Sequence, residues 1–219
     1  MGKSAFYHGI CGRALLRMTA LVVLVCCLVA PAAQARPQRV VSFNLCSEQL
    51  IVALADPAQI AGLSPLAADP ALLVVAHEAA RYRRLDWSAE SLVKLAPDLV
   101  FVGPSDRPTR AMLAAMGIRI VEVPFIADLD DARKQVREMA ALLGQDARGT
   151  ALIAQLDDAE KNLASRARKR TALVIERGGY AAGPRSLIGA MLKVAGLTPP
   201  ARGPGDYGGF VSLEDVIGA

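Results

Sequence analysis

Residues 88–103, SAESLVKLAPDLVFVG, contain a predicted helix followed directly by a predicted strand. The helix covers Ala89–Leu95, and the Pro97-Asp98 pair ends it because proline cannot continue a helical hydrogen-bond ladder. Leu99–Val102 is a short apolar run, as expected for a strand that is buried on both faces of a sheet. This helix–strand unit predicts an α/β fold.

The same alternation extends to both sides and predicts an N-terminal α/β lobe over residues 36–127. Helices of about ten residues between short strands favour a parallel sheet with βαβ crossovers. The other predicted strands are Arg39–Phe43, Gln59–Leu63 and Ile118–Val123, and the other predicted helices are Ser47–Ala55 and Thr109–Met116.

Residues 128–169 lack a strand pattern and carry two amphipathic stretches instead. The first is predicted to be a helix that ends at Gly144. The second, Asp146–Arg168, is about 20 residues long, so as a helix it would span roughly 30 Å and could bridge two lobes. We interpret its charged side chains, including Asp157 and Glu160, as a solvated face.

Strand and helix patterns resume over residues 170–219, which we predict to be the start of a C-terminal α/β lobe. The expected fold class is therefore two small parallel-sheet lobes joined by one long α-helix, with the second lobe incomplete. The predicted elements are the strand Ala172–Glu176, the loop Gly178–Tyr180, the helix Ser186–Val194, the Pro/Gly-rich loop Pro199–Gly209 and the helix Ser212–Ile217.

A short internal repeat links the two predicted lobes. Ser212–Ile217 (SLEDVI) resembles Ser88–Val93 (SAESLV), and each segment begins a predicted helix. In the first copy a Pro-Asp pair and an apolar strand follow, whereas after the second copy the sequence continues only through Gly218 to Ala219. The repeat indicates a duplication, and we expect the chain to be a C-terminally incomplete fragment.

Residues 1–35 are predicted to be a cleavable Sec-type signal peptide. Three basic residues precede the apolar run Met18–Ala30, and a small-residue triplet ends at Ala35, the expected cleavage position. The run is shorter than the roughly 20 residues of a membrane-spanning helix, so an uncleaved anchor is the weaker alternative. A lipid anchor is not expected, because Val25 rather than a small residue precedes Cys26. The chain is therefore predicted to be exported and to begin near Arg36.

Removal of this segment changes the charge and the cysteine content. Three of the 25 basic residues and none of the 21 acidic residues lie in it, so the remainder carries a net charge of +1. Nucleic-acid binding therefore loses its main support. Of the four cysteines only Cys46 remains, and a single thiol cannot form a disulfide within its own chain.

Five segments carry a resemblance to a known family: RVVSFNLCSEQLIVAL (39–54), AGLSPLAADP (61–70), residues 88–103, GIRIVEVP (117–124) and GGYAAG (178–183). They resemble the periplasmic substrate-binding proteins of ABC importers for ferric siderophores, haem and vitamin B12. The resemblance covers nearly all of the chain after residue 35 and implies two α/β lobes bridged by a stiff helix. It also implies a periplasmic monomer that delivers a small-molecule chelate to a permease/ATPase complex in the inner membrane.

Ligands of open α/β sheets bind beyond the carboxyl ends of the strands, and this rule nominates candidate contacts. Arg84 lies where B12-binding members of the resembling family place an aromatic pocket residue, which counts against B12. Together with Arg83, Arg177 and Arg202, Arg84 could form a cationic rim for an anionic ferric siderophore, and a corrinoid or haem is the next candidate ligand. The alternative is that these four arginines are solvated loop residues. The candidates are Asn44, Leu45, Cys46, Ser64, Pro65, Leu66, Arg84, Pro104, Ser105, Phe125, Gly178, Gly179 and Tyr180.

Glu90 and Glu214 occupy equivalent positions of the internal repeat. In the resembling family, one exposed acidic residue on each lobe docks into the permease dimer, and charge pairs of this kind set the register of an encounter. The alternative is that each glutamate is favoured in the first turn of its helix by the helix dipole. Both roles are compatible.

Two other classes of protein remain as alternatives, an exported enzyme and an adaptor of the cell envelope. Cys46, near a helix start, is a weak candidate for a nucleophilic thiolate, but His77 is the one histidine after residue 35 and no base is evident. The same scarcity argues against a site for free metal, so any metal is expected to arrive as a chelate. We predict neither enzymatic activity nor a resident cofactor.

Overall fold

The computed structural model describes residues 36–86, 88–104, 107–200 and 203–217, which belong to one compact unit that begins at Arg36. The predicted signal peptide with its cleavage position Ala35 lies outside the described residues, as do Ser105 and Arg202 among the candidate contacts. Within the described residues no helix is long and apolar enough to cross a lipid bilayer.

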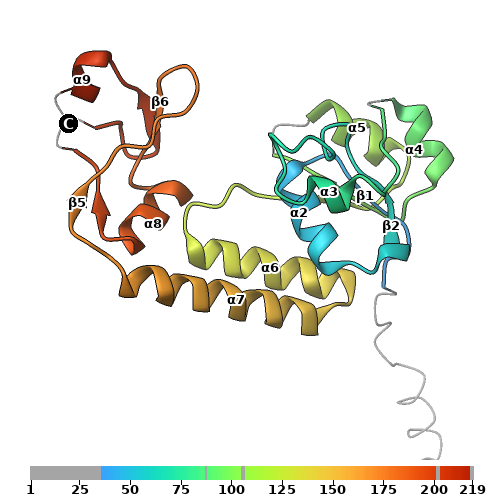
Figure 1. Ribbon diagram of the computed structural model, residues 1–219. Coiled ribbons are helices and arrows are strands. Elements are labelled where there is room, and N and C mark those ends of the chain that lie inside the picture. The colour runs from blue at the N-terminus through green and yellow to red at the C-terminus, as the bar shows by residue number, and fades with distance from the viewer. Residues whose placement is uncertain (1–35, 87, 105–106, 201–202, 218–219) are drawn as a thin grey trace, which may run out of the picture. The chain divides into compact units, whose positions relative to one another are not determined.

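The N-terminal part contains the predicted parallel sheet (Figure 1). Its strands are β1 (Val40–Ser42), β2 (Ile60–Gly62), β3 (Leu99–Val102) and β4 (Ile120–Glu122), and they pair in the order β2-β1-β3-β4. All of these pairs are parallel. Each strand lies within its predicted segment, so the βαβ interpretation of this region is confirmed.

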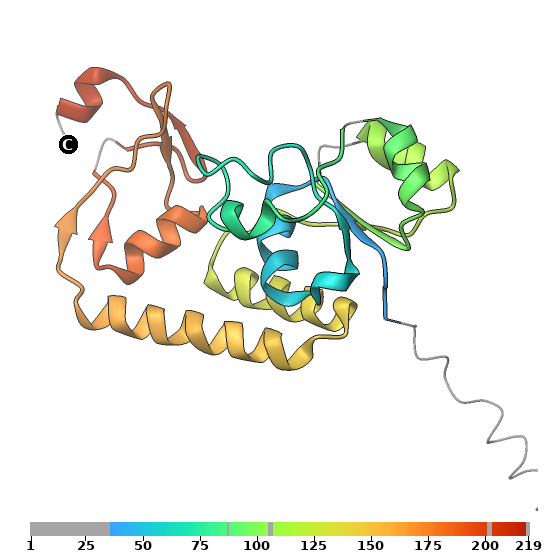
Figure 2. The same ribbon diagram turned by 45° about the vertical axis from the view of Figure 1, so that its right-hand side comes forward.

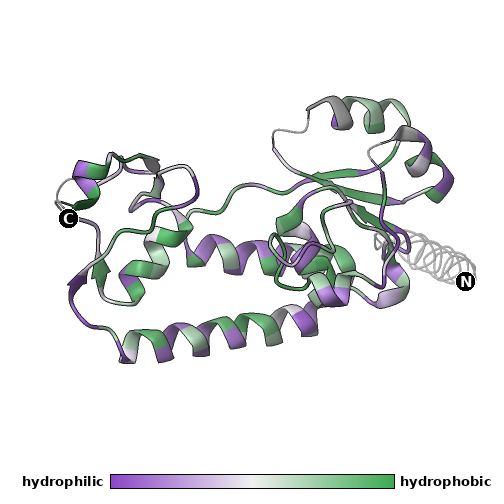
Figure 3. Ribbon diagram, turned by 45° about the horizontal axis from the view of Figure 1, so that its top comes forward, coloured by the Kyte–Doolittle hydropathy of each residue, from purple (hydrophilic) through white to green (hydrophobic). Residues whose placement is uncertain are grey.

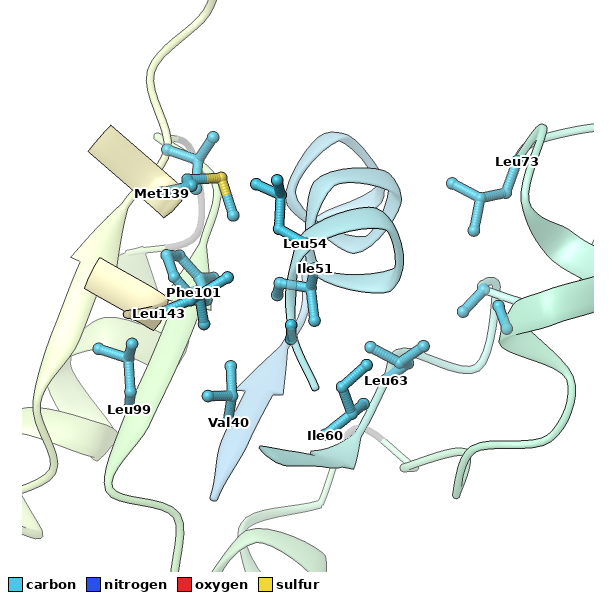
Figure 4. Packing of buried hydrophobic residues seen from close by; sticks show 14 of the residues in the cluster. Val40, Ile51, Leu54, Ile60, Leu63, Leu73, Leu99, Phe101, Met139 and Leu143 are labelled. Atoms are coloured by element: carbon cyan, nitrogen blue, oxygen red, sulfur yellow. The ribbon is translucent and has the colours of Figure 1, made fainter. Parts of the chain in front are cut away.

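Helices cover both faces of this sheet. They are α2 (Leu45–Leu54), α3 (Ala76–Ala79), α4 (Ala89–Leu95) and α5 (Arg107–Ala115), and a 3-10 turn, η1 (Pro57–Gln59), leads into β2. Side chains of successive strand residues point to opposite faces. Phe101 therefore packs in one buried cluster with α2, while Val100 and Val102 pack in another with Leu92 of α4 and Leu113 of α5. Figure 4 shows the first cluster and Figure 3 the apolar character of the strands.

Two antiparallel helices follow the sheet. They are α6 (Leu129–Leu143) and α7 (Asp146–Ser165), which lie side by side in Figures 1 and 2. α6 ends at Gly144, where a positive φ of 68° ends a helix at little cost for glycine. α7 has 20 residues and thus extends roughly 30 Å, as predicted, although it ends three residues before Arg168.

The charged face of α7 is not wholly solvated, which corrects the sequence-based interpretation. Arg133 of α6 forms ion pairs with Asp157, at 2.8 Å, and with Glu160. Both carboxylates lie on the side of α7 that meets α6, so their charges hold the two helices together. The carboxylates of Asp157 and Glu160 raise the pKa of Arg133, and the hydrogen bond to Asp157 has the larger effect. Asp158, by contrast, pairs with Lys161 of its own helix, and both of these side chains are exposed.

The C-terminal part contains two small sheets and two helices. α8 (Leu187–Val194) packs against α6 and α7 (Figure 2), and α9 is Leu213–Ile217. β5 (Arg170–Thr171) and β7 (Leu197–Thr198) form a pair that is parallel, in line with the expected fold class, although neither strand was predicted. β6 (Tyr180–Ala182) and β8 (Gly208–Phe210) are antiparallel. The predicted boundaries after residues 127 and 169 remain predictions.

Three predictions for this part were wrong. The segment Ala172–Glu176 is not a strand and contains a single bridge, between Ile175 and Ala181. A turn at Gly178 and Gly179 reverses the chain directly after it, and the Glu176 amide donates to the Tyr180 carbonyl across that turn. Both glycines have a φ above 80°, which that turn requires. The predicted loop Pro199–Gly209 contains the start of β8, and Tyr180, predicted to be in a loop, begins β6.

Candidate functional site

The carboxyl ends of the four parallel strands meet at one edge of the N-terminal sheet. The residues that follow them are 43–46 after β1, 63–66 after β2, 103–104 after β3 and 123–125 after β4. We call these residues the strand-end edge. It brings together every described candidate contact of the N-terminal part except Arg84. Arg84 does not follow a strand of the sheet but pairs with Leu63 of the second loop.

Asn44 occupies the centre of the strand-end edge. Its side-chain oxygen accepts a hydrogen bond of 3.0 Å from the Ser47 amide and so caps α2. Gly103, after β3, lies so close that a Cβ atom there would be 3.0 Å from the Asn44 side-chain nitrogen. The Asn44 residue therefore has its side chain packed against the third loop, and it is only partly exposed to solvent.

The two residues after Asn44 differ in exposure. Leu45 is half-buried and packs against the first core cluster, so it contributes to packing more than to a ligand surface. Cys46 is exposed and its thiol is free. Of this pair, Cys46 is the side chain that is open to solvent.

Ser64 is buried at the start of the second loop, which sequence reasoning did not foresee. Its amide donates to one carboxylate oxygen of Glu48 at 2.8 Å, and its hydroxyl donates to the other at 3.2 Å. Ser64 is therefore already engaged by the protein. Leu66, two residues further on, is 41% exposed and presents an apolar surface to solvent.

Glu48 is the important side chain that the sequence analysis missed. It lies in the first turn of α2 and is fully buried. Burial raises the pKa of Glu48, and the hydrogen bonds from Ser64 oppose that rise. One signal was available in the sequence: Glu48 lies three residues before buried Ile51 and thus on the apolar face of the helix.

Arg84 is brought beside the second loop by a short extension of the sheet. A parallel bridge pairs Arg84 with Leu63, and the Leu85 amide donates to the Leu63 carbonyl at 2.9 Å. The Arg84 side chain and its neighbour Arg83 are exposed. These two cations therefore lie next to the strand-end edge.

The far side of the edge carries exposed and half-exposed apolar residues. Phe125, after β4, is 82% exposed, and Pro104, after β3, is half-buried. An aromatic ring at this level of exposure is available to stack on a ligand. The edge thus combines an apolar surface with cations at one end.

Tyr180 belongs to the C-terminal part, not to this edge. Its half-buried ring meets Phe210 edge-to-face, with 5.7 Å between the ring centroids. Phe210 is largely exposed, and nearby Tyr207 stacks under the Arg185 guanidinium at 4.8 Å. Gly178 and Gly179 form the turn before this aromatic group.

Glu90 and Glu214 have matching local structures. Glu90 lies in the first turn of α4, which Ser88 caps by accepting a hydrogen bond from Ser91. Glu214 lies in the first turn of α9, where Ser212 accepts from Asp215 in the same way. Both glutamates are exposed. The internal repeat therefore extends from sequence to local geometry.

The described residues contain no group of three or more His, Cys, Asp or Glu side chains that could hold a metal ion. Oxygen, nitrogen and sulfur ligands supplied by such groups are what a protein site for a free metal needs. The arrangement at the strand-end edge is instead one of apolar surface, amide and guanidinium groups.

Comparison with protein families gives one match. The model of a family described as "periplasmic binding protein" matches residues 40–217, which include nearly all of the described chain. A comparison with curated protein sequences gives no match.

Several solved structures share the fold. A possible iron-binding, periplasmic solute-binding protein from Staphylococcus epidermidis superposes with a TM-score of 0.68 at 15% identity, over 84% of this chain and 74% of that one. A periplasmic heme-binding protein from Roseiflexus gives 0.66 at 24% identity, over 83% and 73%. A periplasmic vitamin B12-binding protein of Vibrio cholerae gives 0.61 at 17% identity, over 83% and 72%. The chain thus spans about three quarters of their length.

Proposed function

The chain belongs to the periplasmic binding protein family, and from this premise we propose that it is the solute-binding component of an ABC importer. Its proposed ligand is a chelated metal, with a ferric siderophore favoured and a corrinoid or haem next. The solved structures of similar fold come from proteins described as binding iron, heme or vitamin B12, which supports this range.

The strand-end edge is the observation that carries the proposal. Parallel α/β sheets bind their ligands at this edge, and here the loops after all four strands converge on it. Asn44, Cys46, Leu66 and Phe125 offer an amide, a thiol and apolar surface to a small molecule. No step of covalent chemistry is needed for such a role, so we propose binding and not catalysis.

Exposed arginines favour an anionic ligand. Arg83 and Arg84 lie beside the second loop of the edge, and Arg177 is exposed before the turn that leads to Tyr180. Guanidinium groups bind carboxylates and other oxyanions through paired hydrogen bonds. A ferric siderophore of the carboxylate or catecholate type therefore fits this rim better than a corrinoid does.

Delivery to the membrane is assigned to Glu90 and Glu214. We propose that these two exposed carboxylates dock with a permease/ATPase complex of the inner membrane. The proposal includes a periplasmic location without a lipid anchor and a monomeric state, in line with the signal sequence predicted over residues 1–35.

A ligand panel tests the function. The exported chain is mixed with a ferric catecholate, ferric citrate, haemin and cyanocobalamin, and binding is followed by quenching of its single tryptophan and by the melting temperature. We expect one of the ferric chelates to give saturable quenching at micromolar concentration or below, together with a higher melting temperature. If all four ligands leave both signals unchanged, the proposed function is wrong.

A further inference from the structure

We infer that Glu48 is a positioning residue of the strand-end edge, whose buried carboxylate fixes the second loop, residues 63–66, against the start of α2. The inference rests on the proposed function, because it concerns how the binding surface is held in place. Glu48 itself does not reach the surface, so it would act through the loop residues that do.

The second loop needs a lateral support. It follows β2, an outer strand of three residues that pairs only with β1 in the sheet and has an irregular register there. On its outer side, Leu63 bonds the backbone of Arg83 and Leu85. On its inner side, both carboxylate oxygens of Glu48 accept hydrogen bonds from Ser64. Glu48 therefore supplies the side-chain connection between this loop and α2.

The carboxylate itself is held by a stiff support. The Glu48 amide donates to the Asn44 carbonyl at 2.9 Å in the first turn of α2. The hydroxyls of Ser42 and Ser47 lie 2.7 Å apart, and Ser42 is the last residue of β1. The start of α2 is thus fastened to the central part of the sheet. Through its two hydrogen bonds with Ser64, Glu48 holds the second loop against this fixed helix start.

Packing alone does not account for an acidic side chain at this position. A buried carboxylate is unfavourable unless hydrogen bonds compensate for lost hydration, and an apolar side chain would fill the same space more cheaply. What the apolar side chain could not do is accept the hydrogen bond from the Ser64 amide. Glutamine could: its oxygen can accept from the amide and its nitrogen can donate to the Ser64 hydroxyl. The proposed role requires these two bonds and not the charge.

Two substitutions separate positioning from charge. In the full chain, Glu48→Ala removes both bonds, whereas Glu48→Gln keeps both. We expect Glu48→Ala to weaken binding of the ferric chelate at least 10-fold and to speed hydrogen exchange of the Ser64 amide. Glu48→Gln should remain within about 3-fold of the unchanged protein in Kd and should keep the slow exchange.

A matched control corrects for general loss of stability. Gln59 is also buried, and its side-chain nitrogen donates to the carbonyls of Pro37 and Leu143, before β2 and away from the strand-end edge. Gln59→Ala should lower the melting temperature but leave the Kd of the folded protein unchanged. If Glu48→Ala does not fold, Glu48→Asp replaces it, since its shorter side chain cannot make both bonds.

Three outcomes decide the matter. The inference is overturned if Glu48→Ala changes neither the Kd nor the hydrogen exchange of the Ser64 amide. It is also overturned if Glu48→Gln loses as much ligand affinity as Glu48→Ala does. If the unchanged protein binds no ligand of the panel, the proposed function fails. In that case the exchange rate of the Ser64 amide still shows whether Glu48 holds the loop.

Discussion

At the scale of single residues, the N-terminal part buries polar groups only where the protein itself satisfies them. Gln59 bonds two carbonyls, and Glu48 bonds Ser64 twice. Across the described residues, no buried side-chain nitrogen or oxygen lacks a hydrogen-bond partner. Such groups set positions more than they add net stability, because their bonds replace bonds to water.

Glu48 should make the stability of the protein depend on pH. Since burial raises its pKa above 4.5 in the folded state, the folded chain binds more protons than the unfolded chain between these two pKa values. The Glu48 contribution to the free energy of unfolding is therefore fully present below about pH 4.5 and falls as the pH rises through the folded-state pKa. Glu48→Gln lacks this loss, so its stability relative to the unchanged protein should increase with pH. Urea unfolding from about pH 4 to pH 8 measures the difference, and a difference that is independent of pH would contradict it.

Arg84 should contribute to ligand affinity through its charge. Replacing it by glutamine removes a cation next to the strand-end edge, and we expect the Kd of an anionic ferric chelate to rise about 3- to 10-fold. Arg119 provides the control. It is also exposed, but it precedes β4 and so lies at the amino end of the strand, away from the strand-end edge. Arg119→Gln should leave the Kd unchanged. Equal effects of the two substitutions in a titration at constant ionic strength would show that Arg84 is only a solvated charge.

At the scale of elements, α6 and α7 depend on a close approach at one glycine. A Cβ atom on Gly149 of α7 would lie 2.4 Å from the Cβ atom of Ala140 on α6, and Gly149 is buried. Further along the same contact, Arg133 binds the carboxylates of Asp157 and Glu160. Close apolar packing near one end and ion pairs near the other fix how α7 lies on α6.

Gly149→Ala should therefore destabilise the protein, although alanine favours helix formation. By helix propensity alone the substitution would stabilise α7 by about 1 kcal/mol. The clash with Ala140 should outweigh this and lower the free energy of unfolding by about 1–3 kcal/mol. Urea unfolding gives the sign directly. A more stable Gly149→Ala protein would mean that the two helices can separate without cost.

At the scale of the whole molecule, the sequence predicted most where structure depends on local patterns. The helix and strand in residues 88–103 follow from apolar spacing and from a breaker, and both were correct. The strand β8 was missed because two of its three residues are glycines and its partner β6 lies about 25 residues away. Glu48 was missed for a different reason: its spacing from Ile51 places it on the apolar face of α2, but an acidic side chain is normally expected to be exposed. The strand-end residues could be named in advance because a general rule of parallel sheets places them.

The paired glutamates provide a test for the molecule as a component of a transporter. Glu90 forms an ion pair with Lys94 at 2.7 Å, but both side chains are more than half exposed, so this pair is weak and leaves the carboxylate available to a partner. Changing both Glu90 and Glu214 to glutamine should reduce uptake of the ferric chelate by cells at least 10-fold and leave its Kd for the purified protein unchanged. The single variants should have smaller effects, because each leaves one contact with the permease dimer. Glu78→Gln is the control, since this exposed glutamate on α3 has no counterpart in the repeat. Unchanged uptake in the double variant would reject docking through these residues, and a weaker Kd would instead place them in the ligand site.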